Sequence, residues 1–145
     1  MRVSTRGRYA LRMMLDLAMH DNGEYIALKD ISARQGVSVK YLEQIVSVLS
    51  KADMLKSVRG PQGGYKLAKS PDSYTVGDIL RVTEGSLAPV ACLDSAQNDC
   101  PRAETCATLG FWQELYDTVC GVVDKTTLAD LADRVRQSNG MDFII

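Results

Sequence analysis

The stretch Val58-Arg59-Gly60-Pro61-Gln62-Gly63-Gly64-Tyr65 decides the fold of the first half of this chain. Its three glycines and one proline exclude a helix interior and a central strand. Strand-like residues flank it, at 55–58 and 65–67. We therefore predict a β-hairpin whose tip carries Arg59, a side chain suited to a narrow, electronegative groove. Taken alone, the same residues also fit an ordinary exposed hairpin.

A helix-turn-helix pattern precedes the hairpin. Residues 28–35 favour a short helix, and Gly36 suits the left-handed position after its end. Ser38 can cap a second helix from Val39 to about Ala52. The apolar stripe of this second helix comprises Leu42, Ile45, Val46 and Leu49. A solvated polar face on a small helical protein is the weaker alternative, because the hairpin follows directly. Helix, turn, helix and two-stranded wing predict a winged helix, a mainly α fold with a small β-wing.

The first turns of the second helix carry polar side chains, and a recognition helix places its first turns against base edges. Arginines also gather at the start of a first helix, expected from about Thr5 to His20. Positive charge opposes the helix dipole there and hints at an external anion such as phosphate. The apolar face expected for this helix comprises Leu11, Met14, Leu15, Ala18 and Met19. The predicted DNA-contact set comprises Arg2, Arg8, Ser38, Lys40, Tyr41, Glu43, Gln44, Arg59, Gly60, Pro61 and Gly63.

Charge is distributed unevenly along the chain. The formal net charge is −1, but residues 1–70 carry 12 of the 17 lysines and arginines and 6 of the 18 acidic residues. The first half is therefore positive and the second half negative. The positive half coincides with the helix-turn-helix and the wing, where DNA phosphates must be contacted. This asymmetry indicates one face for double-stranded DNA and another for a different role.

The 145 residues, 46% of them hydrophobic, suit one domain or a small domain with an extension. No apolar run approaches the ~20 residues of a membrane span, and the N-terminus lacks the apolar core of a secretory signal. We therefore expect a cytoplasmic protein with no membrane partner. Since thiols stay reduced in that compartment, the four cysteines are interpreted as ligands, redox thiols or core residues.

The second half contains a short helix, from Val76 to about Glu84, and a long helix after a segment without periodicity. Apolar residues recur in the long helix at spacings of three and four: Leu109, Trp112, Leu115, Tyr116, Val119, Val122 and Val123. A small domain has little interior left to cover this stripe, so we predict that it pairs with the same helix of a second chain. Packing against the chain's own first helix is compatible with that pairing. A homodimer would present two recognition helices to a pseudo-palindromic operator.

These elements divide the chain into four parts. Residues 1–84 are expected to form the winged-helix DNA-binding domain, and residues 85–108 a cysteine-containing loop. Residues 109–137 would form the dimerisation helix and a last helix. Residues 138–145 are an apolar tail to which the sequence assigns no role.

The unperiodic segment holds Cys92, Cys100 and Cys106, and thiolates favour zinc or an iron–sulfur cluster. Structural zinc sites usually pair cysteines two to four residues apart, whereas here seven and five residues intervene. The wide spacing favours a cluster; redox thiols and inert residues are the alternatives. Cys120 lies within the long helix and is interpreted as a packing residue.

The chain resembles the winged-helix regulators that include the iron–sulfur sensor IscR, the nitric oxide sensor NsrR, the iron regulator RirA and the cysteine regulator CymR. The resemblance covers nearly all of residues 1–137. It rests on Ser4-Thr5-Arg6-Gly7-Arg8-Tyr9-Ala10, on Tyr41-Leu42-Glu43-Gln44, on residues 57–65, and on the cysteine loop followed by Trp112. It is closest to the IscR branch, whereas CymR-like members lack the cysteines.

The resemblance implies a homodimeric transcription regulator, a repressor, whose DNA binding depends on the state of a cluster. Tyr41, Glu43 and Gln44 would read the major groove, and Arg59 would enter the minor groove. The three loop cysteines would be the thiolate ligands, with 2Fe–2S slightly favoured over 4Fe–4S by analogy with IscR.

The fourth ligand is the point at which the chain departs from the family pattern. IscR-like proteins have a histidine three residues after the last cysteine, where this chain has Leu109. The acidic residue used by NsrR-like proteins corresponds to Arg8. The candidates are Asp94, Asp99, Glu104, a residue of the partner chain, or an exogenous thiol.

Two other classes of protein are the alternatives. An enzyme needs a converging set of nucleophile, base and oxyanion donors, and the chain offers one histidine and no motif for such a set, so no enzymatic activity is expected. A cluster-free repressor that responds to thiol oxidation or to a small molecule, on the same scaffold, is the main alternative function.

Overall fold

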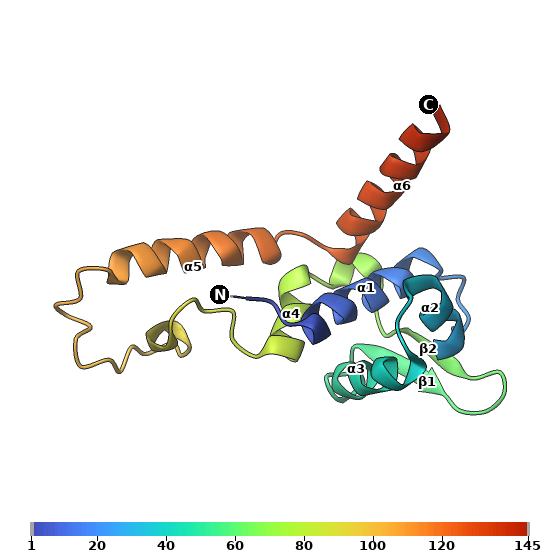
Figure 1. Ribbon diagram of the computed structural model, residues 1–145, viewed down its shortest axis with the longest axis horizontal. Coiled ribbons are helices and arrows are strands. Elements are labelled where there is room, and N and C mark those ends of the chain that lie inside the picture. Colours follow the sequence, from blue (N-terminus) through green and yellow to red (C-terminus); the bar gives the residue numbers. More distant parts are fainter. Residues whose placement is uncertain (1, 145) are drawn as a thin grey trace.

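The computed structural model describes the backbone of residues 2–144 and the side chains of residues 2–139. The helices and strands follow one another as α1 (Thr5–Met19), α2 (Leu28–Gln35), α3 (Val39–Lys51), β1 (Leu55–Val58), β2 (Gly64–Leu67), α4 (Val76–Glu84), α5 (Leu109–Val123) and α6 (Leu128–Ile144), with 3-10 turns η1 (Pro71–Ser73) and η2 (Ala91–Leu93). Helices α1 to α4 and the hairpin form a body at one end of the molecule (Figure 1). Helix α5 runs beyond that body beside the cysteine-containing loop, and α6 projects from it. None of the described helices is both long and apolar enough to cross a bilayer.

The predicted helix-turn-helix is confirmed residue by residue. Gly36 ends α2 in the left-handed conformation, with φ of 65° and ψ of 33°. The Ser38 hydroxyl accepts a hydrogen bond from the Tyr41 backbone N–H at 3.1 Å and caps α3. The four predicted apolar residues of α3 are its buried residues. The fold is therefore the predicted winged helix, with α3 in the position of a recognition helix.

The wing is a two-stranded antiparallel hairpin in which Leu55 pairs with Leu67 and Val58 with Gly64. Its tip turns tightly: the Gly63 N–H donates to the Gly60 carbonyl at 2.9 Å, and Gly60 has a φ of +111°. A Cβ at Gly64 would collide with the backbone of Ile26, which bridges the second strand through Tyr65. The glycines therefore serve the turn and a close backbone contact, which explains why this stretch dominates the sequence signal.

The core lies between α1, α2, α3 and α4, and α1 passes through its centre. The buried residues of α1 are Gly7, Ala10, Met13, Met14, Asp16, Leu17 and Ala18. Of the predicted apolar face, Met14 and Ala18 are buried, and Leu11 and Leu15 are half-buried and pack against the core. Met19 is half-buried, and Ala10 and Leu17, which the predicted face did not include, are buried as well.

An ion pair between the buried Asp16 and the more exposed Arg34 joins α1 to α2. Asp16 is 3% exposed, and Arg34 donates to its two carboxylate oxygens at 2.7 and 3.0 Å. Gln35 donates a third hydrogen bond at 2.9 Å. Burial alone would raise the pKa of Asp16, but these hydrogen bonds and the charge of Arg34 outweigh it and hold the pKa below its ordinary value.

We expect Asp16→Asn to lower the free energy of unfolding by about 1–3 kcal/mol at pH 7, because a neutral amide replaces the buried carboxylate that accepts the hydrogen bonds of Arg34 and Gln35. A carboxylate with a depressed pKa stabilises the fold above its unfolded pKa of about 4, and that stability is lost as the pH falls through the folded pKa. The difference between wild type and variant should therefore shrink below pH 4. Urea denaturation at pH 7 and at pH 3 measures it, with the exposed Asp72→Asn as control. A difference independent of pH would contradict the ion-pair explanation.

Helix α4 connects the body to α5. It begins in a capping box, in which the Thr75 hydroxyl accepts from the Asp78 N–H while the Asp78 carboxylate accepts from the Thr75 N–H. Near its other end, Arg81 forms two hydrogen bonds with Asp124, at 2.5 and 3.0 Å. Within its own chain, helix α5 thus packs on α4, whereas the alternative packing considered from the sequence was on α1.

Helix α6 begins with Leu128, which is fully buried against the body. It continues to Ile144, whereas the C-terminal helix predicted from the sequence ended at residue 137. The predicted tail at 138–145 is therefore helical in backbone as far as Ile144, and the side chains of its apolar end lie outside the described residues.

Candidate DNA-binding surface and cysteine loop

The exposed face of α3 forms one side of a shallow hollow beside the start of α1. Lys40, Glu43, Gln44 and Ser47 from α3 line this hollow with Arg6 from α1, around a volume of about 550 Å³. Three of these five residues belong to the predicted contact set. Arg6 belongs to the arginines at the start of the first helix that hinted at phosphate, although the contact set did not include it. Ser47 was missed; it lies one helical turn from Gln44, which is the signal that could have found it.

Tyr41 lies differently from its polar neighbours. Its ring packs edge-on against Tyr9, with centroids 5.8 Å apart, and Arg12 stacks on the Tyr9 ring at 4.9 Å. Arg12 also donates to the Gln35 backbone carbonyl at 2.6 Å. Tyr41 is thus half-buried and braces α3 against α1 and α2, with only part of its ring available to a ligand.

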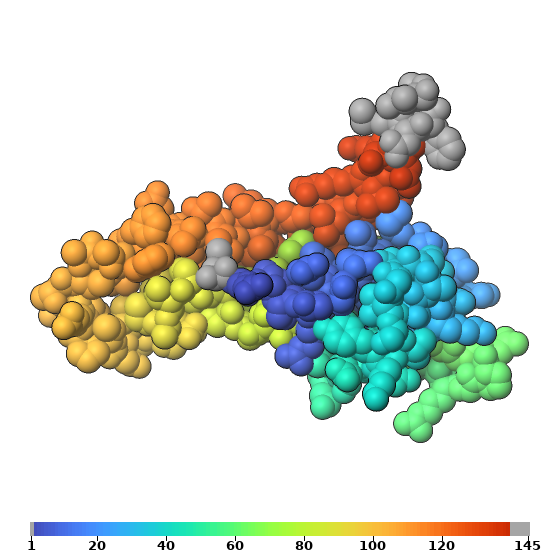
Figure 2. Space-filling model, viewed as in Figure 1, coloured from blue at the N-terminus to red at the C-terminus, as the bar shows by residue number. Residues whose placement is uncertain are grey.

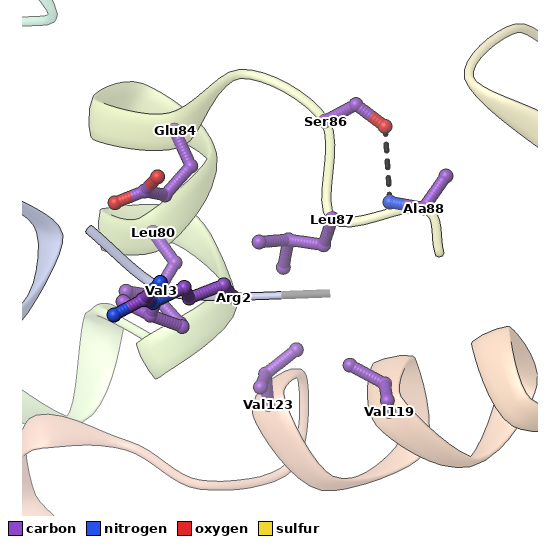
Figure 3. A pocket seen from close by; sticks show the side chains of 9 residues that line it. All are labelled: Arg2, Val3, Leu80, Glu84, Ser86, Leu87, Ala88, Val119 and Val123. Carbon is purple, nitrogen blue, oxygen red and sulfur yellow. Dashed lines mark hydrogen bonds between the residues drawn. The ribbon is translucent and has the colours of Figure 1, made fainter. Parts of the chain in front are cut away.

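Arg2 lies apart from the α3 hollow. It lines a cavity of about 250 Å³ between the N-terminal segment, α4 and α5, together with Leu80, Leu87 and Val119 (Figure 3). Beside it, Glu84 accepts a hydrogen bond from the Ser4 N–H at 3.1 Å at the start of α1. A carboxylate of the chain itself therefore sits at this helix N-terminus, where the arginines had hinted at an external anion.

Arg59 stands at the exposed tip of the wing, which projects from the surface of the body (Figure 2). Within the described residues, no side-chain hydrogen bond or ion pair engages its guanidinium. Arg8 is likewise exposed, with its guanidinium 6.0 Å from the centre of the Tyr9 ring. Free cations at a projecting tip and beside an exposed recognition face provide the charge that contact with DNA phosphates needs.

The cysteine loop lies at the other end of the molecule from the wing (Figure 1). All four cysteines are free thiols; Cys92 and Cys120 are half-buried, and Cys100 and Cys106 are exposed. Cys92 and Cys100 line a common hollow of about 360 Å³ with Ser95 and Asp99. Cys106 lies apart from them at the start of α5, where its Sγ is 3.5 Å from the Thr108 hydroxyl. Hydrogen bonds from Thr108 lower the pKa of the Cys106 thiol.

The donor set of this loop fits an iron–sulfur cluster in its chemistry, since it offers three thiols on one segment. The described residues do not assemble three candidate ligands into a formed metal site. The hydrogen bonds found within 88–106 span only two or three residues, such as Leu93 N–H to Val90 O and Ala103 N–H to Cys100 O. A segment held by such local bonds has low local stability, so a ligand can rearrange it at small cost.

The loop also contacts the inner side of α5. A second hollow, of about 350 Å³, is lined by Cys92, Leu93 and Asn98 from the loop and by Leu109, Gln113 and Tyr116 from α5. One turn further along the helix, Arg81 donates to the Cys120 sulfur at 3.6 Å. Cys120 therefore contacts a guanidinium from α4 as well as its apolar neighbours, which the sequence did not foresee.

Helix α5 has no buried residue, although it is rich in apolar side chains. Val119 and Val123 face the cavity beside α4 (Figure 3). Phe111 and Val122 point outward and are 59% and 62% exposed. The predicted stripe therefore spans two sides of the helix, and Phe111 belongs to the outer side although the sequence analysis omitted it.

The family model described as Rrf2, an iron-dependent transcriptional regulator, matches residues 3–134. This chain belongs to the Rrf2 family. It is 43% identical over 131 residues to "Protein rrf2" of Nitratidesulfovibrio vulgaris, an alignment that covers 90% of this chain and 87% of the relative. It is 38% identical over 133 residues to the HTH-type transcriptional regulator IscR of Escherichia coli, covering 92% and 81%.

Among solved structures, the global cysteine regulator CymR of B. subtilis superposes with a TM-score of 0.76 at 40% identity, over 92% of this chain and 98% of that chain. The comparisons confirm the predicted winged-helix fold and the resemblance stated from the sequence. As an Rrf2-family member, the chain is a transcriptional regulator. The family description refers to iron, whereas CymR is described as a cysteine regulator, so the family includes proteins associated with different signals.

Proposed function

We propose that this chain is a homodimeric DNA-binding regulator whose operator binding is controlled by an iron–sulfur cluster held by Cys92, Cys100 and Cys106. The observation that carries the proposal is the loop itself. Three free thiols share one segment that has only local hydrogen bonds and that contacts α5. Such a segment can change shape when it gains or loses a ligand, and α5 connects it to the DNA-binding body.

The DNA-binding role is supported by the exposed polar face of α3 and by the tip of the wing. Lys40, Glu43 and Gln44 lie on the exposed side of α3, where a recognition helix meets base edges. Arg59 has the length and charge to enter a narrow minor groove beside that site. Arg6 and Arg8, at the start of α1, are suited to neighbouring phosphates, and these contacts would make affinity fall as salt rises.

A bound cluster would supply a redox-active, thiolate-held iron centre that depends on the supply of iron and on oxidants. The residues of the chain then determine how its presence reaches the DNA. Cys92 borders the hollow against Tyr116 of α5, and Asp124 at the end of α5 holds Arg81 of α4. Ordering of the loop would affect the position of α5 and, through the ion pair between Asp124 and Arg81, the position of α4. Of the three acidic candidates for fourth ligand, Asp99 shares a hollow with Cys92 and Cys100 and is the one we favour.

The homodimer is supported by the outer side of α5. Phe111 and Val122 expose large apolar surfaces eleven residues apart, with the half-buried Leu115 between them, so they form one stripe along the helix. Exposed contiguous apolar surface of this kind marks an interaction site. Antiparallel pairing with the same stripe of a second chain would cover it and place two copies of α3 on one DNA duplex.

Anaerobic reconstitution with iron and sulfide tests the ligand assignment. Wild type should become brown and absorb in the visible range, and Cys92→Ala, Cys100→Ala and Cys106→Ala should each fail to hold a stable chromophore, because each removes one thiolate. Cys120→Ala is the matched control and should keep the chromophore. A colourless wild type, or a triple variant with an unchanged spectrum, would refute the cluster.

The thiol-sensor alternative is favoured by one specific observation: Cys100 and Cys106 are exposed and free, so oxidants can reach them. If reconstitution yields no chromophore, this alternative predicts that peroxide changes operator affinity in wild type and that Cys106→Ser abolishes the change.

A further inference from the structure

The hydroxyl group of Tyr74 forms hydrogen bonds at both ends of the wing, where its two strands join the body; we call this junction, at Met54 and Lys69, the root of the wing. Tyr74 lies between η1 and α4 and is 4% exposed. Its hydroxyl donates to the Met54 carbonyl at 2.9 Å and accepts from the Lys69 backbone N–H at 3.0 Å. Met54 directly precedes β1, and Lys69 follows β2 by two residues. One side chain therefore joins the two strands where they leave the body.

The backbone around Tyr74 is itself held by the connection between α5 and α6. The Tyr74 carbonyl accepts from the Leu128 N–H at 3.0 Å, and the Val76 N–H donates to the Thr126 carbonyl at 2.8 Å. Thr75 and Thr127 pair as an isolated antiparallel bridge. Because Leu128 is fully buried, this anchor belongs to the core, and the hydroxyl is held from a fixed point beneath the wing.

The wing needs such a fastening. A two-stranded hairpin is marginal on its own, and residues 56–62 of this one are exposed to solvent. Along β2 it contacts the body through the Ile26 bridge and through Lys66, which lies 4.6 Å from the centre of the Tyr25 ring. Its other contacts lie where the strands leave the body, and there the Ala68 N–H also donates to the Met54 carbonyl at 3.1 Å. Burial raises the pKa of Tyr74, so its hydroxyl stays protonated and able to donate. The direction in which the tip points is therefore set at its root.

We infer that Tyr74 is a positioning residue for DNA reading: its hydroxyl fixes the angle of the wing and so the place at which Arg59 meets the DNA. The inference rests on the proposed role of Arg59. Tyr74 itself touches no DNA in this scheme and acts only through the wing. In a chain that lacks the Arg59 side chain, loss of the Tyr74 hydroxyl should therefore cause no further loss of operator affinity.

A double-mutant cycle for operator affinity tests this, with Tyr74→Phe, Arg59→Ala and the double variant measured at matched salt. Tyr74→Phe should weaken binding by about three- to tenfold, the loss expected from a net hydrogen bond. The double variant should bind no more weakly than Arg59→Ala alone. Hydrogen exchange should report faster opening of the Lys56 and Lys66 amides, which lie in a hydrogen-bonded pair of the hairpin next to its junction with the body, in Tyr74→Phe, with the amides of α3 unchanged.

Thr83→Val is the matched control, since it removes another buried hydroxyl, one that bonds only to the backbone of α4. It should leave operator affinity at the wild-type value, which separates wing positioning from a general loss of stability. Two results would overturn this inference while leaving the proposed function intact. One is a wild-type operator affinity in Tyr74→Phe; the other is a double variant whose fold-loss in operator affinity equals the product of the two single fold-losses. An Arg59→Ala variant with wild-type affinity would overturn the wing-reading function and the inference with it.

Discussion

Val122→Glu is expected to convert the dimer into monomers at micromolar concentration and to weaken operator binding by about a hundredfold or more, because two linked recognition helices give way to one. The residue is 62% exposed, so a glutamate there stays solvated in the isolated chain and the fold should survive. In the proposed dimer the same carboxylate would be buried without a partner. Sedimentation and an operator titration measure the two effects.

Asp117→Ala, a change of a charged residue on another side of α5, is the control and should leave the dimer intact. Val119→Glu provides a contrast, because Val119 faces the cavity beside α4 and its replacement should lower the melting temperature of the chain itself. A wild-type chain that sediments as a monomer would remove the basis for the α5 interface.

Arg59→Ala should lower specific operator affinity by about ten- to a hundredfold at matched salt. The guanidinium has no internal partner in the described residues, so its removal costs the fold nothing and its whole effect falls on binding. Arg59→Lys should recover only part of the loss, because lysine keeps the charge but is more strongly hydrated than the planar guanidinium. Fluorescence anisotropy with a labelled operator measures both variants.

Gln62→Ala changes an exposed neighbour at the same tip and should have a much smaller effect. Equal operator affinities for wild type and Arg59→Ala would show that Arg59 makes no contact that contributes to DNA binding. The hairpin would then be an ordinary surface loop.

The elements that were predicted well are those that rest on local signals. Gly36 and Ser38 mark the turn and the cap of the helix-turn-helix, and Thr75 with Asp78 marks the start of α4. Each signal involves residues within four positions of one another, so it can be recognised in the sequence without knowledge of the fold. The glycine-rich hairpin belongs to the same class.

The parts that the sequence did not predict depend on contacts between distant residues. Asp16 forms an ion pair with Arg34, and Arg81 forms one with Asp124, 43 positions further along the chain. No spacing or motif in the sequence indicates either pair. The predicted apolar face of α1 lacked Ala10 and Leu17 for a related reason, since the full extent of its buried side is determined by the helices that surround it. For the cysteine loop, spacing identified the donors, but their arrangement depends on a ligand and on the fold of the loop.

The division of α5 into an inner and an outer side has a consequence for how such a regulator responds to its own abundance. Phe111 and Val122 are exposed in their own chain, so the strength of pairing can vary at these positions with little cost to folding. If only pairs of chains occupy an operator, occupancy below the dissociation constant of the pair rises with the square of the chain concentration. A twofold change in synthesis would then produce about a fourfold change in the species that binds DNA, and Phe111 and Val122 would set the concentration at which this steep response begins.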